Sequence, residues 1–338
     1  MRKLLNTLYI TSDNAYLTLD GENIVCRLED DEKFRMPFDN LESIVCFSFQ
    51  GCSPALMGKC VENLIPISFI SPYGKFLAKV MGETRGNVFL RVAQIDTFRE
   101  SFLRLTQNTV AAKIGNTLSL INRSRHDSPE LRNDVDISET VSSLKDSIAS
   151  VYASESAEAV LGIEGNCAKR YFLIFNKLIR NKSFEFGTRT KRPPLDPVNA
   201  VLSFIYTLYT NEFSAALETV GLDSYIGFYH ALRSGRSSLA CDMVEEVRCI
   251  AERFTITMIN LGILNDSDFE MQVSGAVYLN DDGRKKVLTR WQEKKRSDIV
   301  HPYLNQKIQL GLLPYIQSNL MAKYIRGEIE EYPCFLLK

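Results

Sequence analysis

The first ninety residues alternate between apolar and polar positions in short runs, and many of the apolar positions are β-branched or aromatic. This pattern is typical of strands that bury one face. Five such runs lie at 6–11, 15–19, 23–28, 33–37 and 42–47. Asp20-Gly21 stands between two of them and predicts a tight hairpin. The chain is therefore expected to begin with a small antiparallel sandwich or roll.

A short helix and a second hairpin are predicted after these runs. Ser53 can cap a helix over 55–64, with Pro54 at its first position. Two further apolar runs, at 65–71 and 75–82, are joined by Pro72-Tyr73-Gly74. This tripeptide predicts a turn between two strands.

The apolar period becomes helical at about Val92 and stays so, which predicts a domain boundary near 85–95. Asp196 as a cap, Pro197 in the first turn and Gly221 just past the end delimit one helix clearly. Helices are expected over 98–123, 139–160, 162–180, 197–219, 239–261 and 301–326, with a polar loop over 123–138. The prediction is an α+β protein, with a β-sandwich-like domain over 1–90 and a larger all-α domain over 91–338.

Composition narrows the class of protein. The 338 residues are 45% hydrophobic and 24% charged, and the mean hydropathy is −0.10. No apolar run approaches the ~18 residues that a membrane helix needs. The N-terminus also lacks the small-residue cleavage site of a secretory signal peptide. We therefore expect a cytoplasmic protein. The eight cysteines include no C-x-x-C pair, which excludes a zinc ribbon and predicts small buried hydrophobic residues rather than disulfides.

Charge is balanced overall but uneven along the chain. Forty Lys and Arg face 41 Asp and Glu, for a net charge of −1. Residues 164–192, however, hold eight basic and two acidic side chains, and a second basic cluster occupies 284–296. Two such clusters can form a positive surface that binds an anion, or they can be the solvated faces of helices.

A histidine-dependent site has few candidate residues, because the chain has three histidines, His126, His230 and His301. His230 lies in a Gly-punctuated segment that leads into a helix. An apolar stripe on that helix leaves Asp242 and Glu245, at i and i+3, on other sides. An imidazole with nearby carboxylates suits Mg²⁺ or Mn²⁺, although such a histidine can also be solvated or held by structural hydrogen bonds.

A further carboxylate ligand is needed, and Glu164 is the candidate. It is flanked by Gly162 and Gly165 and opens a predicted helix whose next turn carries Lys169 and Arg170. A carboxylate beside a basic turn can meet a cation that is bound to a phosphodiester. The alternative is an acid at a helix N-terminus, stabilised there by the helix dipole.

Four linked segments, 162–172, 192–206, 221–230 and 238–248, resemble in order and spacing the CRISPR adaptation integrase, the metal-dependent DNA endonuclease and integrase family. Segments 87–94 and 113–116 are also similar to it. The end of the chain, 326–335, is similar to the branch found with type I-C systems. Three flanking positions depart from the common pattern, and none of them is a ligand: Ser224, Cys241 and Cys334.

The resemblance implies a site and partners. Glu164, His230 and Glu245 would be the ligands of Mg²⁺ or Mn²⁺, and Asp242 would be an acidic member of the same catalytic site. The DNA backbone would be held by basic residues that include Lys169, Arg170, Arg189, Lys191 and Arg192. The family also implies a homodimer formed through the β domain and a small ferredoxin-like partner protein.

The reaction implied is attack by the 3′-OH of a prespacer DNA on a phosphodiester at a CRISPR repeat, which acquires a spacer. Two alternatives stay open. One is a stand-alone structure-selective nuclease or junction resolvase that uses the same metal site. The other is a non-enzymatic DNA-binding scaffold, in which the acids form salt bridges.

Overall fold

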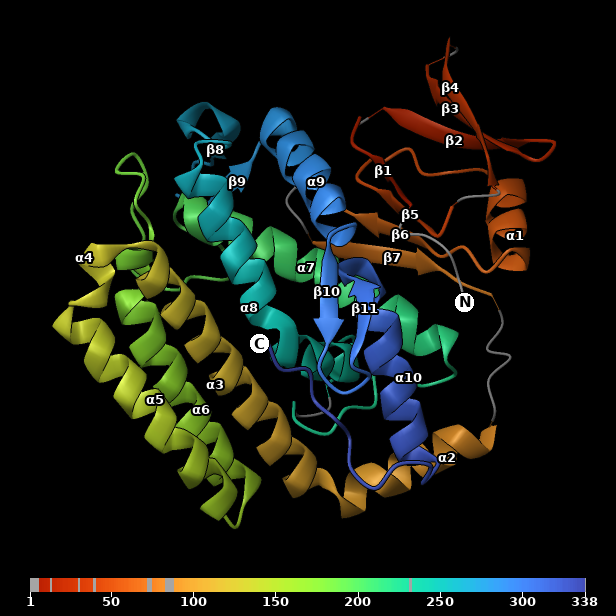
Figure 1. Cartoon of the computed structure of the whole chain (residues 1–338). Coiled ribbons are helices and arrows are strands. Elements are labelled where there is room, and N and C mark those ends of the chain that lie inside the picture. Colours follow the sequence, from red (N-terminus) through yellow and green to blue (C-terminus); the bar gives the residue numbers. More distant parts are fainter. Residues whose placement is uncertain are drawn as a thin grey trace.

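Two small sheets form the N-terminal part of the protein, at the upper right of Figure 1. The computed structural model describes residues 6–12, 14–29, 31–38, 41–71, 75–82, 88–230 and 233–337. The first sheet has the order β2-β3-β4, with β2 at Ala15–Asp20, β3 at Asn23–Leu28 and β4 at Asp31–Pro37. The second has the order β1-β5-β6-β7, with β1 at Thr7–Ile10, β5 at Ser43–Cys46, β6 at Ile67–Ile70 and β7 at Phe76–Val80.

The hairpin predicted at Asp20-Gly21 is confirmed. Asp20 pairs with Asn23, so the turn between β2 and β3 has two residues. Gly21 has φ +57°, a left-handed conformation that glycine adopts without steric cost.

The prediction that all of these strands are antiparallel is wrong for the second sheet. β1 and β6 both run parallel to β5, and only β6 and β7 form the expected antiparallel pair. Parallel neighbours need a crossover, and the chain passes through the first sheet between β1 and β5 and through α1 (Pro54–Glu62) between β5 and β6. The predicted cap of α1 is confirmed, because the Ser53 side chain accepts from Leu56 N at 3.2 Å. The turn predicted at 72–74 lies outside the described residues.

Helices make up most of the remaining chain, and α3 lies among α5, α6 and α8 (Figure 1). Their bounds are α2 Val88–Glu100, α3 Phe102–Asp127, α4 Pro129–Arg132, α5 Val135–Ala153, α6 Ala157–Phe175, α7 Pro197–Thr219, α8 Ser238–Asn260, α9 Asp281–Lys295 and α10 Leu313–Ile325. Short 3₁₀ turns are η2 Asn176–Leu178, η3 Asp266–Asp268 and η4 Leu310–Leu312. Two hairpins pair β8 Phe269–Met271 with β9 Val277–Leu279, and β10 Asp298–His301 with β11 Gln306–Gln309.

Several helix predictions need correction, although the α+β class is confirmed. The expected loop over 123–138 is mostly helical, because Pro129 starts α4 and the Asp134 side chain caps α5 by accepting from Ile137 N at 3.0 Å. Most side chains between residues 123 and 136 are at least partly exposed, so the segment shows no apolar stripe. The helix predicted over 301–326 begins only at Leu313, and His301 ends β10 instead. The two hairpins add strands to a part that was expected to be all-α.

The basic cluster at 284–296 lies on α9, a helix that periodicity did not assign. Val287, Leu288 and Trp291 form its buried face. Trp291 packs edge-on against Tyr209 of α7 and Phe254 of α8, with ring centroids 5.2 Å apart in both pairs. The helix that carries the basic cluster therefore has one buried face and is not fully solvated.

One hydrophobic core joins the second sheet to the helices. Phe47 stacks on Phe204 of α7 with ring centroids 5.7 Å apart. All eight cysteines are free, and the prediction of buried small residues is confirmed except for Cys241 and Cys334, which are half-buried. Among the described residues, no helix has the length and apolarity that crossing a membrane requires.

Candidate active site

Glu164 lies in the middle of α6, not at its start as the sequence suggested. The helix begins at Ala157, where the Ser156 side chain caps it by accepting from Ala159 N at 3.2 Å. Glu164 is thus two turns inside the helix, beyond the first turn in which the dipole favours acids. Glu164 is therefore not stabilised as an acid at a helix N-terminus. The reason for a carboxylate at this position has to be sought in its side-chain contacts.

Asp242 on α8 holds the segment that carries His230. Its Oδ2 accepts the backbone N–H groups of Phe228 at 2.7 Å and Tyr229 at 3.0 Å. Its Oδ1 accepts His230 N at 3.0 Å and lies 2.7 Å from His230 Nδ1. Four contacts occupy both oxygens of this fully buried carboxylate. Asp242 is therefore placed as a positioning residue that sets the orientation of the imidazole.

Gly227 allows the segment to come this close to α8. A Cβ at Gly227 would lie 2.8 Å from Ser238 C and would also collide with the Asp242 carboxylate. The glycine punctuation seen in the sequence therefore has a steric reason, since another residue would push His230 away from α8.

His230 and Glu245 face one another. With Nδ1 directed at Asp242, the other ring nitrogen, Nε2, lies 3.9 Å from Glu245 Oε1. Glu245 is one turn further along α8 than Asp242, as the i, i+3 spacing predicted, but it is almost completely buried. The polar face of α8 is thus enclosed by protein rather than exposed to solvent.

Lys113 of α3 joins the two candidate glutamates. Its ammonium contacts Glu164, and it lies 2.6 Å from Glu245 Oε2. Burial lowers the pKa of Lys113, but Glu245 and Glu164 outweigh that effect and raise the pKa above its ordinary value. One buried cation therefore links α3, α6 and α8 at this point.

Arg248 supplies a second positive charge. Its Nη1 lies 2.5 Å from Glu245 Oε1, and its guanidinium stacks 4.3 Å from the centroid of the Tyr206 ring. Burial raises the pKa of Glu245, but Arg248 and Lys113 outweigh it and lower the pKa far below the ordinary value. Glu245 therefore stays ionised although it is buried.

Lys113 and Arg248 were not among the site residues expected from the sequence. Both stood inside the segments that carried the family resemblance, but neither was given a role. A usable signal existed for Lys113, which interrupts the apolar run Val110-Ala111-Ala112 and Ile114 of α3. A lone charge on a buried helix face indicates a buried partner of opposite charge.

The donor set suits a hard divalent cation. Two carboxylates and one imidazole nitrogen are ligands that Mg²⁺ and Mn²⁺ accept. Glu245 Oε2 lies 2.6 Å from the Lys113 ammonium and Oε1 lies 2.5 Å from Arg248, so an ion would share this carboxylate with two cations. As they stand, no three His, Cys, Asp or Glu side chains within the described ranges are arranged to coordinate one ion. The Lys113 ammonium lies between the two carboxylates.

The basic residues that were expected to hold DNA differ in their surroundings. Lys169 and Arg170 are exposed on α6, and Lys191 and Arg192 are exposed in the segment before α7. The ammonium of Lys191 is nevertheless partly desolvated, which together with Arg248 and Arg189 lowers its pKa.

Arg189 has a different position. Its guanidinium donates to Asn199 Oδ1 at 2.7 Å and to Ser203 Oγ at 3.1 Å, and it lies 5.4 Å from the centroid of the Tyr206 ring. These bonds fix the segment before α7 onto that helix. Arg189 is thus placed to hold Lys191 and Arg192 at the surface rather than to reach a phosphate itself.

The chain is similar over most of its length to proteins of one known family. The family model of CRISPR associated protein Cas1 matches residues 8–293. A CRISPR-associated endonuclease Cas1 of Chlorobaculum tepidum is 39% identical over 342 residues, covering 99% of both chains.

Solved structures share the fold. A casposase bound to an integration product has a TM-score of 0.83 at 20% identity, covering 97% of this chain and 92% of that one. A Cas6-RT-Cas1–Cas2 complex also has a TM-score of 0.83, at 22% identity, covering 98% of this chain and 36% of the matched one. At these identities the likeness concerns the fold.

Proposed function

Since the chain belongs to the CRISPR-associated protein Cas1 family, we propose that it is a divalent-metal-dependent DNA endonuclease and integrase that inserts prespacer DNA into a CRISPR array. The observation that carries this proposal is that Glu164 and Glu245 meet at the Lys113 ammonium while His230 Nε2 faces Glu245 at 3.9 Å. They come from α6, α8 and the segment before α8. A purely structural salt bridge between Lys113 and Glu245 would not require the His230 imidazole to face the Glu245 carboxylate as well.

In this proposal Glu164, His230 and Glu245 hold Mg²⁺ or Mn²⁺. The bound ion would lower the pKa of the attacking oxygen and offset charge on the phosphate oxygens. Asp242 keeps the His230 ring turned toward Glu245. Lys113 and Arg248 keep Glu245 ionised, and thus ready to bind a cation, before the ion arrives.

The proposal extends to DNA and to assembly. Lys169, Arg170, Lys191 and Arg192 would contact phosphates, with Arg189 as a positioning residue. Residues 1–90 would form the dimerisation domain and 91–338 the catalytic domain. A small ferredoxin-like partner would complete the machinery. The occurrence of this fold in a complex of Cas1 with Cas2 supports a partner protein.

A DNA-binding scaffold is the second candidate, because one observation favours it. Lys113 already pairs with both glutamates, which is what a structural salt-bridge network would show. A stand-alone nuclease or resolvase is not favoured over an integrase by any contact described above.

Strand transfer into a repeat-bearing supercoiled plasmid tests the proposal. We expect joined product with Mg²⁺ or Mn²⁺ and none with chelator, while DNA binding persists in both, because the phosphate contacts need no ion. Equal DNA binding without product in any divalent ion would support the scaffold. Nicking without joining, even with the small partner added, would support a nuclease.

Sedimentation tests the proposed dimer. A C2 dimer is the commonest symmetric assembly, and strands exposed at a sheet edge can pair across it. We expect a dimer at micromolar protein, and a monomer at that concentration would contradict the proposal. Replacing the exposed Phe76 and Leu77 of the edge strand β7 by Lys should then shift a dimer toward monomer if β7 lies in the interface.

A further inference from the structure

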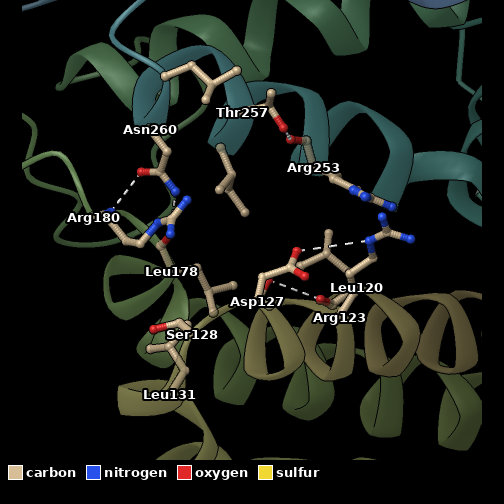
Figure 2. Close-up of a pocket in the computed structure, with 13 residues that line it drawn as sticks. Leu120, Arg123, Asp127, Ser128, Leu131, Leu178, Arg180, Arg253, Thr257 and Asn260 are labelled. Atoms are coloured by element: carbon tan, nitrogen blue, oxygen red, sulfur yellow. Dashed lines mark hydrogen bonds and ion pairs between the residues drawn. The ribbon is translucent and has the colours of Figure 1, made fainter.

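A pocket lies at the C-terminal ends of α3 and α8, where the turn after α6 closes it (Figure 2). Its volume is about 130 Å³. Leu120, Leu131 and Leu178 line part of it, and charged side chains line much of the rest. A pocket of this size admits a small polar group with its waters, since one water takes ~30 Å³ in the liquid.

Positive charge dominates this pocket. The guanidinium groups of Arg123 and Arg253 lie on the same side of the pocket, and Arg180 lies on the opposite side (Figure 2). Lys294 of α9 does not line the pocket, but burial and the charges of Arg253 and Arg123 lower the pKa of its ammonium group. The one acid in the lining, Asp127, lies 4.0 Å from Arg123.

The charge of Asp127 acts on Arg253, but from beyond salt-bridge distance. Neither Arg253 nor Lys294 forms a salt bridge or side-chain hydrogen bond in the part of the chain that the structure describes. Burial and the charge of Arg123 lower the pKa of Arg253, and burial, Arg253 and Arg123 lower that of Lys294. Cations gathered in this way are stabilised by an anion among them.

This pocket is separate from the candidate active site. Arg253 is five residues beyond Arg248 on α8, which is about 140° around a helix of ~3.6 residues per turn. Arg123 is ten residues beyond Lys113 on α3, or about 15 Å along the axis. A group bound here therefore lies away from the phosphate that would react beside Glu164 and Glu245.

We propose that this pocket binds a phosphate of the DNA backbone as a second contact remote from the active site. The inference rests on the proposed function, in that an integrase must hold two DNA segments while only one phosphate reacts. Guanidinium groups match phosphate oxygens in planar, bidentate geometry, and the ammonium of Lys294 adds a point charge. Arg123, Arg180 and Arg253 line the site, and Lys294 adds positive charge from outside the lining.

The test is a double variant, Arg253→Gln with Lys294→Gln, titrated with fluorescent duplex DNA in chelator at several salt concentrations. We expect about tenfold weaker binding, and a slope of log affinity against log salt that is smaller by about one. Arg290→Gln is the matched control, because it lies on α9 near Lys294 but is already paired with Glu293 at 2.8 Å. It should bind DNA within about twofold of wild type.

Each outcome has one meaning, once thermal unfolding shows that both variants are folded. Unchanged affinity and slope in the double variant overturn the inference and leave the proposed function standing. If inorganic phosphate stabilises wild type but not the double variant, while DNA affinity is equal, the pocket serves a free anion and the inference is wrong. A wild-type protein that binds no DNA overturns the proposed function and this inference together.

Discussion

Replacing His230 by alanine is expected to reduce strand transfer and nicking by on the order of a hundredfold or more. The substitution removes the nitrogen that faces Glu245 at 3.9 Å and so weakens the affinity and alignment of the ion. Lys169, Arg170 and the other basic residues are untouched. DNA affinity should therefore stay within about threefold, with nearly the same salt slope.

The matched control is His126→Ala. His126 is exposed at the end of α3, and within the described ranges its side chain approaches only the neighbouring Asp127. This variant should integrate at the wild-type rate. If His230→Ala also integrates at that rate in Mn²⁺, His230 is a packing residue and the proposed site is wrong. If it loses DNA binding and catalysis together, with a lowered unfolding temperature, His230 supports the fold instead.

Replacing Lys113 by methionine is expected to lower the free energy of unfolding by about 3 kcal/mol in chelator. The change leaves the buried carboxylate of Glu245 with Arg248 as its remaining close cation and Glu164 with no ion pair among the described residues. Methionine keeps the length of the side chain, so the packing of α3 changes little. The loss is therefore electrostatic.

A divalent ion should reverse much of this loss. If the ion binds where the two glutamates meet, Mn²⁺ will raise the unfolding temperature of Lys113→Met more than that of wild type, since it replaces the missing charge. Lys145→Met, an exposed lysine on α5, should be close to wild type with and without the ion. Equal destabilisation of Lys113→Met in chelator and in Mn²⁺ would show that no ion binds between Glu164 and Glu245.

Sequence motifs identified the candidate ligands of the site but not the residues that pair with them. Glu164, His230 and Glu245 were selected from the sequence, and in the structure Lys113 contacts both glutamates while His230 faces Glu245. Lys113 itself received no role, because its partners lie 51 positions away on α6 and still further along the chain on α8. Asp242 stood in the site without a defined role, and only its four contacts show that it positions His230.

The sequence by itself determined the local structure: the strand runs, the Gly21 turn, the Ser53 and Asp196 caps, and the bounds of α7. Each of these depends on neighbours within a few residues, so a short window holds all the information. The tertiary structure decided the rest. The parallel pairing of β1 with β5 and the burial of the polar face of α8 depend on packing between distant segments, whose energy no local pattern contains.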